Sequence, residues 1–451
     1  MDKRQFLKSS SAMVTGALLS RLAPGFAESP EAAPDGTNWA GNLHYHARCL
    51  YTPGSLREVQ DTVKQSGSLR ALGSRHSFNA IADSLAAQIS LERLASIEVD
   101  AAAHTVTVGA GVRYGTLAPV IDAKGYAVHN LASLPHITVA GAVATATHGS
   151  GIRNGNLATA VSALELVKAD GEVVTLSRQR DGAVFEGSVV ALGALGVVTQ
   201  VTLNLVRRFD MTQIVYRNLS MAQLRHNLDA ILGSGYSVSL FTNWQHHNIN
   251  QVWIKSRVES KAKVAIPPEF FGAKAATENL HPIDGHSAEN CTQQMGVPGP
   301  WYERLPHFRM NFTPSSGAEL QTEYFVPRNR GYEAILAVEQ LRDKITPHLF
   351  VTEIRTIAAD ELWLSPAYKR DSMAIHFTWK PETPEVTAIL PLIEEKLAAF
   401  DARPHWAKLF TIPPARLNSL YEKMPAYRAL LKQYDPAGKF RNGFIDHNIF
   451  G

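Results

Sequence analysis

Two loops built from small residues constrain this chain more than any other feature. The first follows an apolar, strand-like run at Leu69–Leu72 and reads Gly73-Ser-Arg-His-Ser77. The second reads Val139-Ala-Gly-Ala-Val-Ala-Thr-Ala-Thr-His-Gly-Ser-Gly151. Small side chains let backbone N–H groups approach a bound group closely, so loops of this kind suit a pyrophosphate. The pair therefore predicts a cofactor pocket between two segments that are distant in sequence.

The charge of the chain is distributed unevenly. The formal net charge is +3 over 451 residues, and all of this excess lies within residues 1–27. The rest of the chain is close to neutral, and the overall content of 45 % apolar and 19 % charged residues is typical of a globular protein. Because nucleic acids and anionic membranes attract a basic face, this balance predicts neither as a partner.

Residues 1–27 are typical of an export signal. A basic start precedes a mildly apolar run that ends in Gly25-Phe-Ala27, and the run is too short to span a membrane. Lys3-Arg4 is similar to the twin-arginine signal, with lysine in place of the first arginine. An ordinary secretory signal and a disordered tail are the alternatives. We expect a periplasmic or secreted protein, with a polar linker at residues 28–36.

The hydrophobic periodicity predicts an α+β fold of two domains. Alternating apolar residues predict hairpins at 97–108 and 164–176, and a 3.6-residue period predicts helices at 55–65, 114–124, 332–345 and 384–400. Polarity rises near residue 208, so we place the first domain at 37–208 and the second, substrate domain at 209–415. Residues 267–306 form a long irregular insertion that we expect to be a surface lid.

The two cysteines leave two possibilities open. Cys49 and Cys291 could pair in an oxidising compartment, or each could remain a buried thiol. No His-Glu-x-x-His sequence or zinc-like spacing is present, so we predict no metal site.

Together the two loops resemble the FAD-binding domain of the vanillyl-alcohol-oxidase-type (PCMH-type) flavoproteins, in the branch of aldonolactone and alditol oxidases. The resemblance implies a two-domain flavoprotein with a mixed-sheet substrate domain and a C-terminal segment, 416–451, that returns to the FAD domain. It also implies that His76 holds FAD covalently through the 8α-methyl group, which raises the reduction potential of the flavin. The implied cofactor-binding residues are Ala71, Leu72, Gly73, Ser74, Arg75, His76, Ser77, Ser133, Thr138, Gly141, Thr145, Ala146, Thr147, His148 and Val197.

A second group of candidate functional residues lies in the segment Thr352-Glu-Ile-Arg-Thr356. Alternation along a strand puts Glu353 and Arg355 on one face, where a surface ion pair is the plain structural interpretation. The run 353–366, however, resembles the alditol-oxidase branch, in which this glutamate and arginine bind adjacent hydroxyls of a polyol. The same resemblance implies substrate binding by Ser133, Glu353, Arg355, His376, Thr378 and Lys408, with Glu353, Arg355 and Lys408 as the catalytic groups.

The function implied by this resemblance is oxidation of the terminal hydroxyl of a sugar alcohol to an aldose. Hydride would pass to flavin N5, and O₂ would reoxidise the flavin to give H₂O₂. The nearer alternative is an aldonolactone or sugar dehydrogenase that passes electrons to a periplasmic acceptor other than oxygen. The more distant alternative is a carbohydrate-binding protein without enzymatic activity on the same scaffold.

Overall fold

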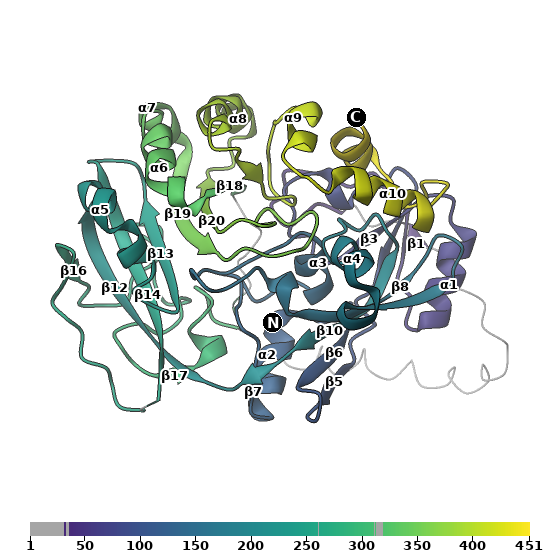
Figure 1. Cartoon of the computed structure of the whole chain (residues 1–451), viewed down its shortest axis with the longest axis horizontal. Coiled ribbons are helices and arrows are strands. Elements are labelled where there is room, and N and C mark those ends of the chain that lie inside the picture. The colour runs from purple at the N-terminus through teal and green to yellow at the C-terminus, as the bar shows by residue number, and fades with distance from the viewer. Residues whose placement is uncertain (1–30, 33–35, 260, 311, 313–318) are drawn as a thin grey trace, which may run out of the picture.

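The computed structural model describes residues 31–32, 36–259, 261–310, 312 and 319–451. Figure 1 shows the two halves of the chain side by side, with the C-terminal helices in yellow lying over the N-terminal half. The predicted export signal at 1–27 and most of the predicted linker at 28–36 lie outside the described residues. Both therefore stay predictions.

A four-stranded sheet supports the first of the two small-residue loops. Its strands, in spatial order, are β1 (Glu31–Ala32), β2 (Cys49–Tyr51), β4 (Ala87–Ser90) and β3 (Leu69–Leu72). Helix α1 (Leu56–Gln65) connects β2 to β3 and begins at Ser55, whose side chain accepts a hydrogen bond from the backbone N–H of Glu58. Val59 and Val63, one turn apart, pack with Leu69 in the core, so the helix fixes the strand that leads to the loop.

A five-stranded antiparallel sheet forms the rest of the N-terminal half. Its order is β5 (Ile97–Asp100), β6 (Thr105–Gly109), β10 (Val197–Asn204), β8 (Val161–Val167) and β9 (Val173–Ser177). Both predicted hairpins, β5–β6 and β8–β9, are confirmed. Gly171 has a φ of +83° in the turn between β8 and β9, a conformation that favours glycine. The other elements of this half are α2 (Tyr114–Ala123), α3 (Val139–Ala144), α4 (Arg178–Val189) and the paired strands β7 (Tyr126–Ala127) and β11 (Val206–Arg207).

The second half is built on one large sheet. Its strands are β12 (Asp210–Ser220), β13 (Ser237–Thr242), β14 (Asn248–Val258), β15 (Glu269–Phe270), β16 (Ala273–Ala275), β17 (Gly299–Pro300), β18 (Leu320–Pro327), β19 (Leu349–Ile357), β20 (Ser372–Trp379) and β21 (Arg403–Pro404). All of their described pairings are antiparallel, which corrects the expected mixed sheet. Strands β18 and β19 are joined by helices and lie one strand apart, and β20 fills the space between them antiparallel to both. The α+β class itself is confirmed.

The helices of the second half are α5 (Met221–Leu232), α6 (Gly331–Glu339), α7 (Arg342–Ile345) and α8 (Thr383–Ala398). The helix predicted at 332–345 is divided into α6 and α7, because the chain turns at Leu341. Helix α8 matches its predicted position within two residues at each end. In Figure 1 these helices lie along one side of the large sheet, which leaves the opposite face of β18, β19 and β20 toward the N-terminal half.

The C-terminal segment contacts the N-terminal half. It contains α9 (Pro414–Ser419), α10 (Met424–Tyr434), α11 (Gly443–Ile445) and a terminal π-helix at Asp446–Phe450. The backbone N–H of Leu69 donates to the carbonyl of Lys439 at 2.9 Å, and the Arg70 guanidinium donates to the carbonyl of Phe440 at 2.7 Å. The Tyr427 hydroxyl donates to the carbonyl of Ala191. The C-terminal segment therefore supplies hydrogen-bond acceptors to strand β3.

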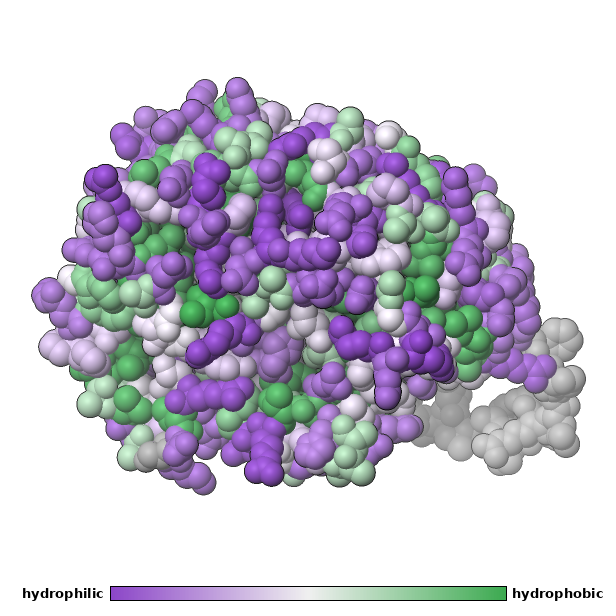
Figure 2. Space-filling model, viewed as in Figure 1, coloured by the Kyte–Doolittle hydropathy of each residue, from purple (hydrophilic) through white to green (hydrophobic). Residues whose placement is uncertain are grey.

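Figure 2 shows one face of the molecule, on which hydrophilic residues predominate and hydrophobic residues are scattered. Among the described residues, the exposed large hydrophobic side chains are Leu85, Val120 and Val184. None of the described helices combines the length and apolar character that a membrane span requires.

Within the described part of the chain, Cys49 and Cys291 are both free thiols, and Cys291 is buried.

Candidate active site

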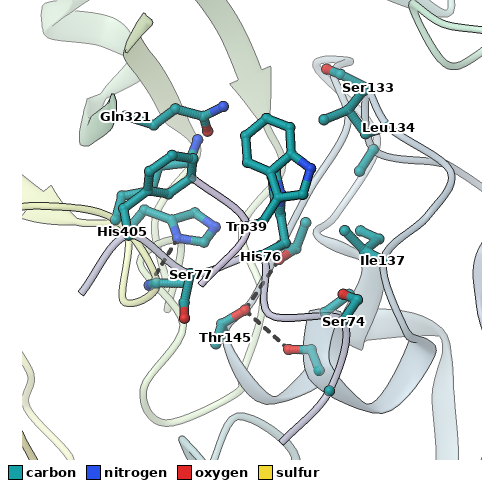
Figure 3. A pocket seen from close by; sticks show the side chains of 18 of the residues that line it. Trp39, Ser74, His76, Ser77, Ser133, Leu134, Ile137, Thr145, Gln321 and His405 are labelled. Atoms are coloured by element: carbon teal, nitrogen blue, oxygen red, sulfur yellow. Dashed lines mark hydrogen bonds between the residues drawn. The ribbon is translucent and has the colours of Figure 1, made fainter. Parts of the chain in front are cut away.

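A cavity of about 590 Å³ lies between the two halves of the chain (Figure 3). One wall is formed by the loop after β3 and by residues 132–148, and the other by β18, β19, β20 and the segment that carries Lys408. The sequence-predicted residues on its lining are Ala71, Leu72, Gly73, Ser74, Arg75, His76, Ser77, Ser133, Thr138, Gly141, Thr145, Thr147, His148, Glu353, Arg355, His376, Thr378 and Lys408. The two small-residue loops and the polar strands thus meet at one cavity.

Two predicted cofactor residues do not line this cavity. Ala146 is buried with a φ of +54° and turns the chain between its neighbours Thr145 and Thr147, which do line it. Val197 begins β10 and packs in the apolar cluster with Val167. Because side chains alternate along a strand, the next residue, Val198, reaches the cavity instead.

His76 lies at the centre of the N-terminal wall (Figure 3). Its Nδ1 is 3.3 Å from Nε2 of His136, and its ring meets that of Trp39 edge-on, with 4.6 Å between ring centroids. Burial, together with the nearby His136 and Lys408, holds the pKa of His76 well below its usual value. The imidazole is therefore neutral at physiological pH and keeps a free lone pair, which is the form that can attack an electrophilic carbon.

The small residues of this wall fit a group as large as FAD. An added Cβ at Gly73 or at Gly141 would lie 2.8 Å from Oγ1 of Thr138, so neither position has room for a side chain beside that hydroxyl. Arg75, next to His76, has a φ of +62°, a conformation that exposes backbone in the turn. Residues 73–77, Thr138 and Gly141 would hold the cofactor against this wall.

The opposite wall carries a row of polar side chains across three strands. His376 on β20 pairs with Glu353 on β19 and with Glu323 on β18, so the three side chains lie beside one another on one face. Arg355 lies two residues along β19 on the same face, with Nε 3.6 Å from Oε1 of Glu353. The sheet register therefore gathers charged groups that are far apart in sequence.

The six predicted substrate-binding residues belong to one network. Arg355 donates to the hydroxyl of Ser133 at 3.4 Å on the N-terminal wall. Nζ of Lys408 donates to Nδ1 of His376 at 2.7 Å, which leaves Nε2 of that ring to donate to the hydroxyl of Thr378 at 3.0 Å. The network joins the two walls of the cavity.

Sequence reasoning missed Glu323 and His307, which hold this network together. Glu323 accepts hydrogen bonds from Arg355 at 2.8 Å and from Lys408 at 2.6 Å, and His148 lies 3.1 Å from it. Nε2 of His307 lies 2.8 Å from Oε1 of Glu353. Glu323 lies in β18, but its role depends on which strands are neighbours. His307 lies beside the irregular insertion and has no periodic pattern.

Neighbouring charges decide the ionisation of this buried cluster. Burial alone would raise the pKa of Glu323, but Lys408, His148 and Arg355 hold it well below its usual range. Glu353 is likewise kept ionised, because Arg355 and His307 outweigh the effect of its burial on its pKa. The pKa of Lys408 is lowered by burial, and Glu323 restores it only in part. The carboxylates of Glu323 and Glu353 thus lie beside two cations, Arg355 and Lys408. Of these two cations, Lys408 is the one whose pKa is lowered.

Two family models match the chain. The model of an FAD binding domain matches residues 47–177, and the model of D-arabinono-1,4-lactone oxidase matches residues 317–448. Alditol oxidase from Streptomyces sp. is 48 % identical over 413 residues, which cover 91 % of this chain and 97 % of the relative. L-gulono-1,4-lactone dehydrogenase from Mycobacterium tuberculosis is 28 % identical over 91 % of this chain and 98 % of the relative.

Solved structures agree with this fold at much lower sequence identity. Cholesterol oxidase from Brevibacterium sterolicum superposes with a TM-score of 0.74 and 15 % identity over 95 % of this chain and 100 % of that chain. Glucooligosaccharide oxidase from Acremonium strictum superposes with a TM-score of 0.70 and 16 % identity over 92 % of this chain and 94 % of that chain. Given the near-complete coverage at 48 % identity and the FAD-binding domain, the chain belongs to the family of FAD-dependent oxidoreductases that contains alditol oxidase and the D-arabinono-1,4-lactone oxidases.

Proposed function

We propose that this protein is an FAD-dependent alditol oxidase that converts the terminal –CH₂OH of a sugar alcohol to an aldehyde. The observation that carries the proposal is the row of Glu353, His376 and Glu323 on the cavity wall. Arg355 contacts both carboxylates, and Lys408 contacts Glu323 and His376. Such a row offers hydrogen-bond donors and acceptors at regular spacing, which matches a chain of adjacent hydroxyls. The 48 % identity to alditol oxidase supports the same substrate class.

Each charged group has a distinct task toward a polyol. Arg355 stays protonated, since Glu353 and Glu323 raise its pKa against the effect of burial, so it stabilises negative charge that develops on oxygen. Glu353 accepts a hydrogen bond from a hydroxyl and orients the carbon chain. Lys408, whose pKa is lowered by burial, takes up the hydroxyl proton from its neutral form, after its ammonium has released a proton. FAD, when bound, supplies the two-electron acceptor that receives hydride at N5 and is reoxidised by O₂.

We also propose that FAD is attached covalently through His76. The neutral ring, its position in the glycine-containing turn and its contact with His136 support this attachment. His136 is itself kept neutral, because burial and the nearby Arg113 lower its pKa to about 4. His136 could therefore take up the proton that His76 loses on attachment. The C–N bond would replace a C–H bond of the 8α-methyl group, with the two electrons taken up by the flavin ring and passed on to O₂.

The test of substrate class is oxygen uptake by purified protein with bound FAD. We expect xylitol or sorbitol to be oxidised with equimolar formation of H₂O₂, and to outperform both short monoalcohols and aldonolactones. The short alcohols leave several buried polar groups without partners, which costs binding energy. A clear preference for a lactone, or turnover with an artificial electron acceptor but not with O₂, would favour the lactone-dehydrogenase alternative.

We further propose that the protein is exported to the periplasm or beyond in a folded state. The basic start with Lys3-Arg4 and the weakly apolar run before Ala27 support this proposal. Replacing Lys3-Arg4 by Lys-Lys should trap the protein in the cytoplasm. Unchanged export in a strain that lacks the twin-arginine translocase would argue for the ordinary secretory route.

A further inference from the structure

One buried cation next to the active site has no part in the proposed chemistry. Lys255 lies in β14, is 1 % exposed and does not line the cavity. Its Nζ donates to the carbonyls of Leu305 and Pro306 at 2.5 and 3.1 Å. It also lies 3.1 Å from Nδ1 of His307. An ammonium has three N–H donors, and these three acceptors use all of them.

The contact with Lys255 determines which nitrogen of His307 carries the proton. A lysine ammonium can only donate, so Nδ1 of His307 must accept, and the ring proton is placed on Nε2. That nitrogen lies 2.8 Å from Oε1 of Glu353, to which it therefore donates. With the other tautomer, the lone pair of Nε2 would face a carboxylate oxygen and the hydrogen bond would be lost.

The aromatic and backbone contacts of His307 hold the ring in place but do not select its tautomer. The aromatic rings of Phe241 and Trp253 meet it edge-on, with 5.5 and 5.2 Å between centroids. Its backbone N–H donates to the carbonyl of Ser133. The tautomer is set from the two ring nitrogens: Lys255 supplies a proton to Nδ1, and the ionised Glu353 accepts one from Nε2. Oε2 of Glu353 has no hydrogen-bond partner among the described residues, so it remains for the substrate.

From this arrangement we propose that Lys255 is a positioning residue: it fixes the Nε2–H tautomer of His307, which in turn orients the Glu353 carboxylate for a substrate hydroxyl. The inference rests on the proposed polyol oxidation and adds two residues to its binding apparatus. Neither residue is assigned a role in the chemical step. In this arrangement, Lys255 on β14 orients His307 in the loop at 305–308, and His307 orients Glu353 on β19.

Three further groups interact electrostatically with Lys255. Glu353 on β19 and the thiol of Cys291 favour the charged lysine, whereas Arg355 disfavours it. Burial dominates and lowers the pKa of Lys255 to about 7. The His307 ring stays neutral, because burial lowers its pKa to about 4. A neutral lysine would have a lone pair able to accept from Nδ1–H, so loss of its proton would permit the wrong tautomer.

The direct test is the tautomer itself. In full-length protein with bound FAD, labelled with ¹⁵N-histidine, the His307 signal is assigned by its loss in His307→Gln. We expect the wild type to show the Nε2–H form at pH 6, and Lys255→Met, which keeps the length of the side chain but has no donor, to show the Nδ1–H form or a mixture. The same tautomer in both proteins would overturn the proposal. This readout does not depend on polyol turnover, so it separates failure of this inference from failure of the proposed function.

The kinetic test uses two pairs of variants. Loss of the oriented carboxylate should raise KM for the polyol about 10- to 100-fold in Lys255→Met, with a smaller change in kcat and unchanged FAD content. Cys291→Ala, a buried change beside Lys255, is the control and should leave KM unaltered. If Lys255→Met lowers thermal stability but leaves KM at the wild-type value, the lysine is merely structural and the proposal is wrong.

The second pair concerns His307 and does not require Lys255 to be changed. Glutamine has a carbonyl that can accept from Lys255 and an amide that can donate to Glu353, whereas phenylalanine fills similar space with neither. We expect His307→Gln to bind the polyol clearly more tightly than His307→Phe. In the His307→Phe background, adding Lys255→Met should have little further effect on KM, because the lysine acts through the histidine. Equal losses in the two His307 variants, or fully multiplicative effects in the double variant, would contradict the relay.

Discussion

Glu323 accepts a hydrogen bond from Arg355 on one carboxylate oxygen and from Lys408 on the other. One buried anion therefore holds both cations of the active site at fixed positions. Its side chain has no exposed surface, and burial of an unpaired charge costs several kcal/mol. Removing the charge of Glu323 should thus disturb both partners together.

We predict that Glu323→Gln lowers kcat/KM for a polyol by about 100-fold or more, because Arg355 and Lys408 lose their common anchor. The glutamine keeps the size of the side chain, so the fold and FAD content should persist. Since Glu323 raises the pKa of Lys408, its loss should lower that pKa further and shift the corresponding limb of the pH–rate profile to lower pH. A pH profile with an unchanged midpoint would show that this limb does not report Lys408.

Arg355→Ala and Lys408→Ala should each depress polyol turnover while FAD content stays intact. Loss of a charged hydrogen-bond partner costs about 2–4 kcal/mol, or roughly 30- to 1000-fold in rate. Arg342→Ala and Lys380→Ala change exposed or partly exposed residues away from the cavity and serve as matched controls. Steady-state oxygen uptake and the flavin absorbance per chain check both expectations. A near-silent Arg355→Ala would refute the assignment of this wall to polyol binding.

Wild-type protein precipitated with acid should retain its yellow colour, whereas His76→Ala should release its flavin. The reason is that His76 is the neutral, cavity-lining nucleophile of the first loop. Flavin fluorescence of the denatured chain on a gel measures the covalent fraction. Release of flavin from denatured wild-type protein would show that attachment is not covalent.

The free energy of unfolding should decrease as the pH falls from about 6.5 to about 4. His307 is buried as the neutral ring with its pKa lowered to about 4, while an unfolded histidine binds its proton near pH 6.5. Unfolding therefore takes up a proton in this window, so acid favours the unfolded chain, by about 3 kcal/mol for this one group. His376 and His405, whose pKa values burial also lowers, should add to the loss. Denaturant unfolding at a series of pH values measures the effect, and constant stability down to pH 5 would contradict it.

The sequence was sufficient to predict the α+β class, both hairpins of the N-terminal half and a shared face for Glu353 and Arg355. These features depend on local rules: alternating strands on either side of a short turn, which contains Gly171 with positive φ in the second hairpin, or the two-residue period of a single strand. The resemblance of short motifs to the family added His376, Thr378 and Lys408 to the predicted substrate site. In the structure these three residues line the same cavity as Glu353 and Arg355.

The role of Glu323 could not be predicted in this way, because it depends on strand order. Only the insertion of β20 between β18 and β19 puts His376 beside both glutamates. Val197 was included only through the family resemblance, and in the structure its side chain packs in the apolar cluster at the start of β10. His307 and Lys255 meet through a loop contact between segments that no local pattern links.

The contacts of Lys439 and Phe440 with β3 have a consequence for biosynthesis. The strand that leads directly to His76 pairs with β4, but it lacks its hydrogen bonds to residues 439 and 440 until those residues have left the ribosome. The described residues that line the cavity end at Lys408, but the strand beside His76 is secured by these later contacts, so we expect stable cofactor loading to follow synthesis of residue 440. A ribosome-stalled chain that ends before residue 435 would therefore present His76 on an unfinished scaffold, and a nascent chain should acquire its flavin only after release.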